Sequence, residues 1–389
     1  MEVGMQPMVE KVFFALIRFE INGDELCEEM KNLITPEMLI ALFKLSKRYD
    51  LAHLIADGLD KNSLLPDGTE AKKRFLQERN MAIYRYEQIQ YEIEQICNTL
   101  EKAKIPFIPL KGSVIRRYYP ESWMRTSCDI DILVKEENLP TAIDALTQEL
   151  NYHHDSTGNH DAHLFAENGV HLELHYKLTP NDEQWNTVLM NIWEYLQDIE
   201  TYHCSLTDEM FYFYHIAHMA GHFKVGGCGI RPLLDLYLLR KYVNYNQEKL
   251  IRLLDEGGLL AFNQGVCALS DYWFMGIVPT QLAIDMQDFI FNAGMYGGME
   301  NRVSIDKVKK RNKLGVLFSR IFLSYDRLKF QYPILQKHKI LVPFYQVKRW
   351  FNLLNKDKRK QAMRELQATV HQDEEKSTHI EGLLNDLGL

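Results

Sequence analysis

The stretch L-K-G-S-V-I-R-R-Y-Y-P-E-S-W-M-R-T-S-C-D-I-D-I-L-V, residues 110–134, decides how this chain is interpreted. Near its end, Asp129 and Asp131 alternate with apolar residues, a pattern typical of a buried strand. Side chains alternate along a strand, so both carboxylates point to the same face. Two carboxylates on one face repel each other and are costly to bury. A divalent cation that prefers oxygen ligands, above all Mg²⁺ bound with phosphates, relieves this cost.

The beginning of the same stretch indicates a phosphate contact. The run I-P-F-I-P-L (105–110) is short, apolar and marked by prolines, which predicts a strand near a sheet edge. Gly112 and Ser113 follow it and precede a short helix over 114–119. Glycine lets a phosphate approach the backbone, and a helix N-terminus offers free N–H groups. Ser113 adds a hydroxyl donor.

A third acid is expected on a later strand. The segments H-L-F-A-E (163–167) and V-H-L-E-L-H-Y (170–176) are separated by Asn168 and Gly169, which predicts a hairpin with a two-residue turn. In the second segment Glu173 shares a polar face with two histidines, and leucines line the other face. If the two strands are neighbours, Asp129, Asp131 and Glu173 can together hold two Mg²⁺ ions. Polymerases use such pairs of ions, one on the triphosphate and one that lowers the pKa of the attacking hydroxyl, for in-line attack.

The rest of the chain is predicted to be helical, which gives an α+β fold with a small mixed sheet between helical regions. Helical segments are expected at 8–20, from Thr35 and Pro36 onward, 51–59, 70–104, 184–199, 207–222, 230–243, 246–256, 261–275 and 279–292. We expect four regions: an N-terminal helical region (1–104), an α/β core (105–180), a helical domain (181–300) and a C-terminal helical tail with basic clusters (301–389).

Composition narrows the class of protein. The 389 residues carry a net charge of −8, which gives no support to a nucleic-acid-binding surface over the whole molecule. The basic runs 307–313 and 356–360 are predicted to be solvated faces, with an RNA-binding patch as the minority interpretation. The six cysteines form no C-x-x-C pair, so neither a zinc knuckle nor a disulfide framework is indicated, and free thiols fit a reducing cytosol. Neither a signal peptide nor a membrane span is expected, and we predict a cytoplasmic protein.

Taken together, L-K-G-S, Y-Y-P, R-T-S-C-D-I-D-I-L-V and V-H-L-E-L-H-Y-K-L resemble the nucleotidyltransferase superfamily of polymerase-beta type. More narrowly, they resemble the uncharacterised nucleotidyltransferase family, which is found mainly in bacteria. The segments 41–55 and 218–239 look like the helical signatures of that family on either side of its core. The resemblance implies a nucleotidyltransferase core that moves a nucleoside monophosphate from an NTP to an acceptor and releases pyrophosphate.

The resemblance also implies roles for individual residues. Gly112 and Ser113 would bind the triphosphate, Asp129 and Asp131 would ligate both metal ions, and Glu173 would be the third carboxylate. The family often has aspartate at the third position and tryptophan where this chain has Tyr176. Glutamate reaches further than aspartate, so whether Glu173 acts as ligand, as base or as both stays open.

Several other polar residues are candidates for the site. Lys111 and Arg125 are predicted phosphate contacts. His175 either orients Glu173, serves as a base or is simply a polar-face histidine. The resemblance favours His218, Arg231 and Asp235 as polar residues that join the helical region to the cleft, although Arg231 and Asp235, four apart, can also form a purely structural pair.

Three functions are weighed. The first is Mg²⁺-dependent nucleotidyl transfer, with ATP as the favoured donor and a small molecule or a protein as the acceptor, because the negative net charge speaks against nucleic acid. The second is a binding or regulatory protein that keeps the fold without the chemistry. The third is a metallohydrolase that uses His215, His218 and His222, which share one helix face.

Overall fold

The structure is a computed structural model that describes residues 6–178, 183–197, 201–293, 325, 328, 334–352 and 374–389. The chain divides into two compact units. The first contains Met1–Met219 and Ile230–Ile284, and the second contains Ala220–Gly229 and Asp285–Leu389. The residues predicted for nucleotidyl transfer all lie in the first unit, whereas His222 of the metallohydrolase alternative belongs to the second.

A five-stranded mixed sheet forms the centre of the first unit. Its strands lie in the order β1-β2-β5-β4-β3, with β2 and β5 parallel and the other neighbours antiparallel. The strands are β1 (Phe107–Pro109), β2 (Asp129–Val134), β3 (His153–Thr157), β4 (Asp161–Phe165) and β5 (His171–His175). The α+β class with a small mixed sheet is confirmed, and so is the edge position of β1.

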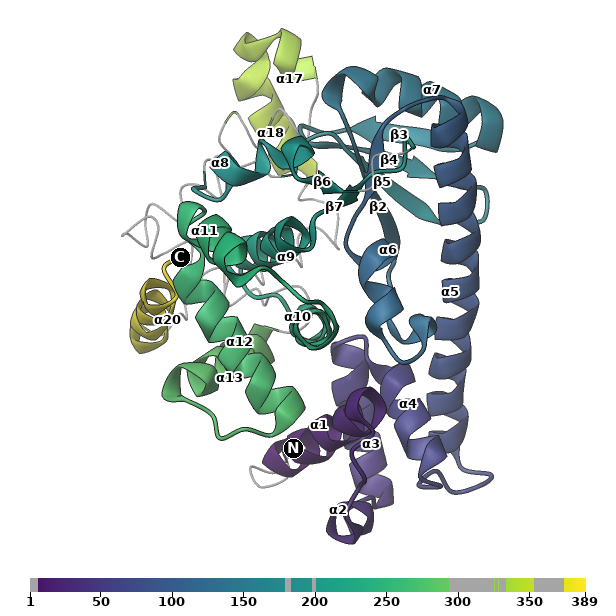
Figure 1. The fold of residues 1–389 in the computed structure, drawn as a ribbon, viewed down its shortest axis with the longest axis vertical. Coiled ribbons are helices and arrows are strands. Elements are labelled where there is room, and N and C mark those ends of the chain that lie inside the picture. The colour runs from purple at the N-terminus through teal and green to yellow at the C-terminus, as the bar shows by residue number, and fades with distance from the viewer. Residues whose placement is uncertain are drawn as a thin grey trace. The chain divides into compact units, whose positions relative to one another are not determined.

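One face of the sheet is covered by helices. Ile130 and Ile132 of β2 and Leu172 of β5 are fully buried in a core formed with α5 (Glu70–Lys102) and α7 (Leu139–Leu150). Figure 1 shows both helices beside the sheet. Because strand side chains alternate, the polar residues of β2 and β5 lie on the opposite face. The predicted division of these strands into an apolar and a polar face is confirmed.

The chain before the sheet is helical, as predicted. Its helices are α1 (Gln6–Asn22), α2 (Glu28–Asn32), α3 (Pro36–Arg48), α4 (Ala52–Lys61) and α5. The Thr35 hydroxyl accepts a hydrogen bond from the backbone N–H of Met38 at 3.2 Å, and proline occupies the first turn. The start of α3 is therefore fixed by the capping residues that predicted it.

The hairpin between β4 and β5 is present, but its turn differs from the prediction. Ala166 N–H donates to Val170 O, and Gly169 N–H donates to Ala166 O, both at 2.9 Å. The loop therefore has three residues, 167–169, with Gly169 in the left-handed region at φ +84°. This conformation suits glycine, which is why the loop can place β5 in register with β4.

Two segments depart from the sequence prediction. The helix expected over 184–199 is replaced by α8 (Asn186–Leu189), a 3-10 turn (Ile192–Glu194) and β6 (Leu196–Gln197), which pairs with β7 (Ser205–Leu206). Apolar residues of 185–192 are buried at helical spacing, but Tyr195 O accepts a hydrogen bond from Thr207 N–H, which draws the chain into a hairpin. The strand β3 was not predicted at all, since all five of its residues are exposed.

The two edges of the five-stranded sheet are different. At β1, Phe107 N–H donates to Tyr202 O and Phe107 O accepts from Cys204 N–H, so this edge is covered by the following chain. At β3, the register with β4 shifts between His154 and Ser156, which marks a bulge on the outer strand.

The remaining helices and turns lie between the strands and after them. The helix α6 (Gly112–Ile115) lies between β1 and β2, and short 3-10 turns occur at Arg116–Tyr118, Ser122–Met124, Glu136–Asn138 and Lys339–Leu341. After the strands come α9 (Asp208–Phe223), α10 (Arg231–Tyr242), α11 (Gln247–Glu256), α12 (Leu260–Met275), α13 (Gln281–Ala293), α17 (Ile334–Lys337), α18 (Val342–Asn352) and α20 (Glu374–Asp386). The predicted basic runs 307–313 and 356–360 lie outside the described residues. Among the described helices, none combines the length and the apolar character that a membrane crossing needs.

Candidate active site

The register of β2 and β5 brings the predicted acids together. Asp131 lies directly opposite Glu173 on the neighbouring parallel strand, and Asp129 lies two residues before Asp131 on the same face. Asp131 is 4% exposed and the side chain of Glu173 is 21% exposed. The three carboxylates therefore form one cluster on the polar face of the sheet, which is the juxtaposition that the sequence predicted.

Asp131 is neutralised by two cationic side chains. Its Oδ1 accepts a hydrogen bond from Lys111 Nζ at 2.7 Å and lies 2.9 Å from His175 Nε2. Lys111 has φ 46° and ψ −122°, a backbone conformation that few residues other than glycine adopt. This strained turn directly follows β1 and directs the lysine side chain across to β2. The sequence predicted Lys111 as a phosphate contact, whereas in the structure its side chain pairs with Asp131.

The pKa values of these groups follow from burial and from their neighbours. Burial alone would raise the pKa of Asp131, but Lys111 and His175 hold it well below its usual range. Burial alone would lower the pKa of His175, but hydrogen bonds with Asp131 and Glu173 raise it to about 9. The hydrogen bond with His175 lowers the pKa of Glu173. Asp131 and Glu173 are therefore ionised at neutral pH.

Asp129 has a different environment. Burial, and next the charge of Asp131, raise its pKa above the usual value. Within the described residues, its carboxylate accepts no side-chain hydrogen bond. Asp129 is therefore the acid of the cluster whose ionised form gains most from a bound cation.

The Gly112–Ser113 turn is tightly packed. A Cβ at Gly112 would lie 3.4 Å from the Arg125 guanidinium and 3.5 Å from the Cβ of Ser127. The N–H groups of Ser113 and Val114 already donate to carbonyls of the same turn, at 3.2 and 3.1 Å. Phosphate binding by these two residues therefore stays a prediction, with the Gly112 N–H and the Ser113 hydroxyl as its candidate donors.

Arg125 forms a buried ion pair with the helical region. Its Nε donates to Asp235 Oδ1 at 2.8 Å and to Oδ2 at 3.0 Å, and the Tyr119 hydroxyl donates to the same Oδ1 at 2.7 Å. Asp235 is 1% exposed. Arg125 is itself 8% exposed, and its phosphate contact stays a prediction. Asp235 thus joins α10 to the loop before β2, as the resemblance implied.

The structural pair between Arg231 and Asp235, which was the alternative to a role at the cleft, does not form. Arg231 instead donates to Asp50 Oδ2 at 2.8 Å and to Thr126 O at 3.1 Å. Both residues lie on α10, but each has its own partner in the loop before β2. Arg125 of this loop pairs with Asp235, and Thr126 accepts a hydrogen bond from Arg231. Arg231 therefore also connects α10 to this loop.

Comparison with protein families adds to this geometry. Residues 39–275 match the family described as uncharacterised nucleotidyltransferase. The chain belongs to this family. Searches among curated proteins and among solved structures returned no match. Membership in this family supports nucleotidyl transfer as the general activity of the chain. The matched range includes Asp129, Asp131 and Glu173.

The carboxylate cluster is suited to a divalent cation. Ligand atoms of Asp131, Glu173 and His175 all lie within 4.8 Å of one another. Carboxylate oxygens are the ligands that Mg²⁺ prefers, and this family member buries more negative carboxylate charge here than Lys111 and His175 neutralise. Asp131, Glu173 and His175 could therefore hold a divalent cation, and the predicted ligand Asp129 lies beside them on the same face.

The histidines of α9 have a structural environment. His215 is buried, and its Nε2 donates to Pro232 O at 2.9 Å. The His218 ring lies 6.1 Å from the Tyr214 ring. Among the described residues, no group of candidate metal ligands includes either histidine. The metallohydrolase interpretation therefore gains no support in this family member.

Two residues of the site escaped sequence reasoning. His163 on β4 lies opposite Glu173, and only the alternation D-A-H-L-F could have indicated its face. Tyr214 on α9 is buried, and this burial raises the pKa of its hydroxyl. The charges of Lys111 and of the three acids also influence this pKa, which places Tyr214 near the cluster. Its sequence context, an aromatic helix, carries no signal of this proximity.

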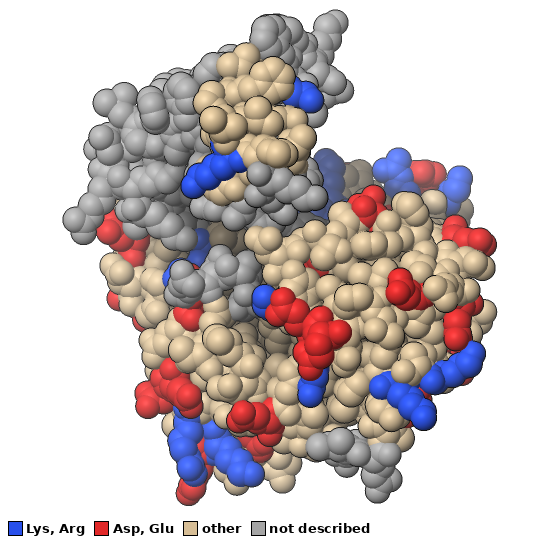
Figure 2. Space-filling model, turned by 90° about the horizontal axis from the view of Figure 1, so that it is seen from above, with Lys and Arg blue, Asp and Glu red and all other residues tan. Residues whose placement is uncertain are grey.

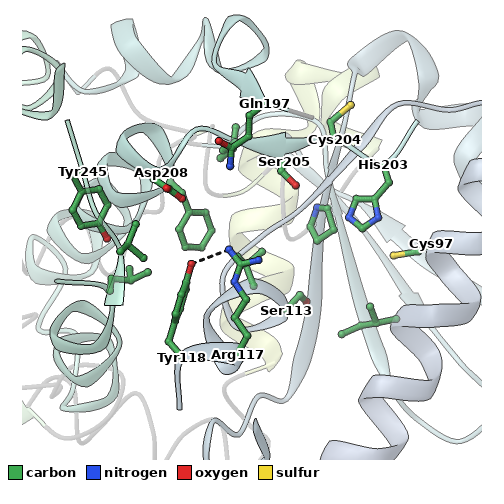
Figure 3. Close-up of a pocket in the computed structure, with 17 residues that line it drawn as sticks. Cys97, Ser113, Arg117, Tyr118, Gln197, His203, Cys204, Ser205, Asp208 and Tyr245 are labelled. Atoms are coloured by element: carbon green, nitrogen blue, oxygen red, sulfur yellow. Dashed lines mark hydrogen bonds between the residues drawn. The ribbon is translucent and has the colours of Figure 1, made fainter. Parts of the chain in front are cut away.

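A cavity of about 300 Å³ lies beside the Gly-Ser turn (Figure 3). Ser113, Arg117 and Tyr118 line one side of it, and its other lining residues include members of α5, β1, β6, β7, α9 and α10. The Tyr245 hydroxyl in this cavity is buried and has no hydrogen-bond partner among the described residues. None of the three carboxylates lines the cavity, so it is separate from the acid cluster.

Proposed function

We propose that this protein is a Mg²⁺-dependent nucleotidyltransferase that moves a nucleoside monophosphate from an NTP, with ATP as the favoured donor, to a small-molecule or protein acceptor. The observation that carries the proposal is the pairing of Asp131 with Glu173 on adjacent parallel strands, with Asp129 on the same face. Family membership supports the reaction class.

The proposed roles follow from the contacts. Asp129, Asp131 and Glu173 would hold two Mg²⁺ ions, whose chemistry would be charge neutralisation at the phosphates and a lowered pKa of the attacking hydroxyl. Lys111 neutralises Asp131 in the metal-free protein and is free to contact the triphosphate once the carboxylate has another cation. Ser113 donates its hydroxyl to the phosphates. His175 orients Asp131 and Glu173 through its Nε2.

Two observations favour a small acceptor over nucleic acid. Figure 2 shows the described Lys and Arg side chains in small separate groups on the face in view, several of them beside acidic side chains. A nucleic-acid-binding face would carry clustered basic residues. The cavity is separate from the acid cluster but adjoins Ser113, the proposed triphosphate contact, and it has the size of a small-molecule site and a lining of both polar and apolar residues. We therefore propose a small molecule, ahead of a second protein, as the acceptor. We also propose that this chain works in the cytoplasm.

The test is a transfer assay. The purified protein is incubated with each labelled NTP, Mg²⁺ and a metabolite extract, and the labelled product is identified. We expect Asp129→Asn and Asp131→Asn to abolish labelling, while Asp155→Asn on the exposed strand β3 leaves it unchanged. Labelling that persists in both site variants would rule out the proposed carboxylate chemistry.

One observation favours a second function. Because Lys111 and His175 together neutralise Asp131, the fold can keep this acid without any metal ion. A nucleotide-binding protein without transfer activity would bind NTP in the presence of Mg²⁺ and give no labelled product from any extract. The same assay, combined with equilibrium NTP binding, separates the two functions.

A further inference from the structure

The polar face of the sheet carries ionisable side chains on three neighbouring strands. The strand register aligns them in rows across β2, β5 and β4: Asp129, His171 and Phe165; Asp131, Glu173 and His163; Leu133, His175 and Asp161. Side chains at paired positions point to the same face and lie within contact distance. Seven of these nine residues are ionisable, so the polar face extends well beyond the three predicted acids.

We propose that His163, His171 and Glu173 form a binding site for a divalent transition-metal ion of the Zn²⁺ class, beside the D-x-D carboxylates. Candidate ligand atoms of these three residues lie within 4.8 Å of one another. Two imidazoles and one carboxylate are a common ligand set for zinc and related ions, whereas Mg²⁺ is bound by oxygen. The site does not require the proposed transfer activity.

The two histidines face each other through ring nitrogens. His163 Nδ1 lies 3.0 Å from His171 Nε2. Two ring nitrogens this close must either share a proton or bind a common cation, because two lone pairs in direct contact repel each other. A small rotation of the two rings turns the facing lone pairs toward one ion.

Neighbouring side chains orient both rings. Asp161 Oδ1 lies 3.5 Å from His163 Nε2, which favours a proton on Nε2 and leaves the lone pair on the Nδ1 that faces His171. A carboxylate behind a histidine ligand is the usual support in protein metal sites. On the other side, the Phe165 ring stacks on His171 with centroids 4.6 Å apart and planes 12° from parallel.

The site is also accessible. His163, His171 and Glu173 are all partly exposed, with His163 at 32%, whereas Asp131 is almost completely buried. An ion can therefore reach the two imidazoles without any rearrangement of the buried Lys111–Asp131 pair. Glu173 belongs to both groups, so an ion held by the histidines would lie next to the D-x-D carboxylates.

The experiment is a Zn²⁺ titration of the full chain. Protein stripped with a chelator is titrated with Zn²⁺ by calorimetry, and Co²⁺ is added in a parallel sample to read imidazole ligation from its visible absorption. We expect one tight Zn²⁺ per chain. The double variant His163→Gln, His171→Gln should weaken this binding at least 100-fold and remove the Co²⁺ bands, with its fold checked by circular dichroism.

Two controls make the result specific. The chain has 14 histidines, so His153→Gln combined with His154→Gln removes two exposed imidazoles from β3 and should leave the titration unchanged. Asp129→Asn combined with Asp131→Asn should keep the Zn²⁺ site and lose Mg²⁺-dependent nucleotide binding, which separates this proposal from the proposed function. Absence of tight Zn²⁺ binding, or unchanged binding in the His163/His171 variant, would overturn the assignment.

Discussion

Lys111 Nζ lies 2.7 Å from Asp131 Oδ1, so a side-chain ammonium neutralises the more buried of the two D-x-D carboxylates. Asp131 lies on β2, and Lys111 lies in the turn that follows the neighbouring antiparallel strand β1, where its strained backbone directs the side chain across. The metal-free protein thus already holds a positive charge beside Asp131. This relationship predicts that the stability of the protein and the proposed Mg²⁺ binding depend on each other.

Lys111→Met should therefore destabilise the metal-free protein and increase the stabilisation by Mg²⁺. Removing one partner of a buried ion pair costs about 3–5 kcal/mol, and the cost here should be smaller because His175 still pairs with Asp131. A bound divalent ion supplies the missing charge, so Mg²⁺ should raise the melting temperature of the variant more than that of the wild type. Thermal unfolding with EDTA and with Mg²⁺ measures both effects.

Lys102→Met is the matched control. Lys102 pairs with Glu149 at 2.8 Å, but its side chain is 73% exposed, so its loss should cost less than about 1 kcal/mol. Equal Mg²⁺ responses of the Lys111 variant and the wild type would contradict a cation site at Asp131.

Asp235→Asn should destabilise the first unit by about 3–5 kcal/mol, because it leaves Arg125 buried without its counter-charge. Urea denaturation measures the free energy of unfolding. The matched control is Asp271→Asn, whose pair with Arg240 is partly exposed and should contribute no more than about 1 kcal/mol. Similar decreases in the free energy of unfolding of the two variants would show that the buried Arg125–Asp235 pair contributes no more to stability than the partly exposed one.

Gly169→Ala should destabilise the protein by about 1 kcal/mol, because a side chain is strained at φ +84° even though nothing lies within 4 Å of the added Cβ. The same substitution at Gly221, which also has open space but lies in α9 without a positive φ, should be neutral or stabilising. Unfolding by urea compares the two. A neutral result at Gly169 would contradict the three-residue loop.

The protein should lose stability as the pH falls below about 6.5. His53 and His215 are buried, and each donates a hydrogen bond to a backbone carbonyl, of Met124 and Pro232 respectively. Burial lowers the pKa of both, so the folded protein keeps them neutral while the unfolded chain takes up a proton at each. Their stabilisation is complete above the unfolded pKa and is lost as the pH falls toward the folded value.

The measurement is the free energy of unfolding between pH 5 and pH 8. Each histidine adds at most about 1.4 kcal/mol per pH unit to the slope. His215→Gln keeps a side-chain N–H donor and cannot titrate, so it should flatten the profile. If this variant leaves the slope of the free energy of unfolding against pH unchanged, groups other than His215 cause the loss of stability at low pH.

Local pattern predicted the elements that build the site. The alternation in β2 and in β5 fixed which residues face the core, since a face must be either apolar or polar along a whole strand. The identity of Glu173 as the third acid followed from that alternation and from the hairpin before it. The exact loop did not, because both two- and three-residue turns accept an Asn-Gly sequence.

Long-range pairs could not be predicted. Arg125 and Asp235 are 110 residues apart, and nothing in either segment indicates the other. The sequence suggested instead that Asp235 pairs with Arg231, one helical turn away. Tertiary placement of α10 against the loop before β2 decided otherwise, because it offered each of the two residues a better-placed partner.

Exposed and short elements were also missed. The residues H-H-D-S-T of β3 have no apolar face, so their sequence carries no strand signal. The segment after residue 184 has helical spacing of buried residues, yet it bends into the β6–β7 hairpin. In both cases, neighbouring strands supply the backbone hydrogen bonds that hold the segment.

The unequal edges of the sheet have a consequence for how the protein behaves when concentrated. With β1 covered by residues 202–204, β3 is the edge at which a strand from another molecule could be added. The bulge near Asp155 interrupts the row of backbone N–H and C=O groups along the outer edge of β3. The exposed histidines and the aspartate of β3 would also have to be desolvated if a strand of a second molecule paired with this edge. The outer strand that carries no part of the active site thus protects the sheet from fibril-like growth.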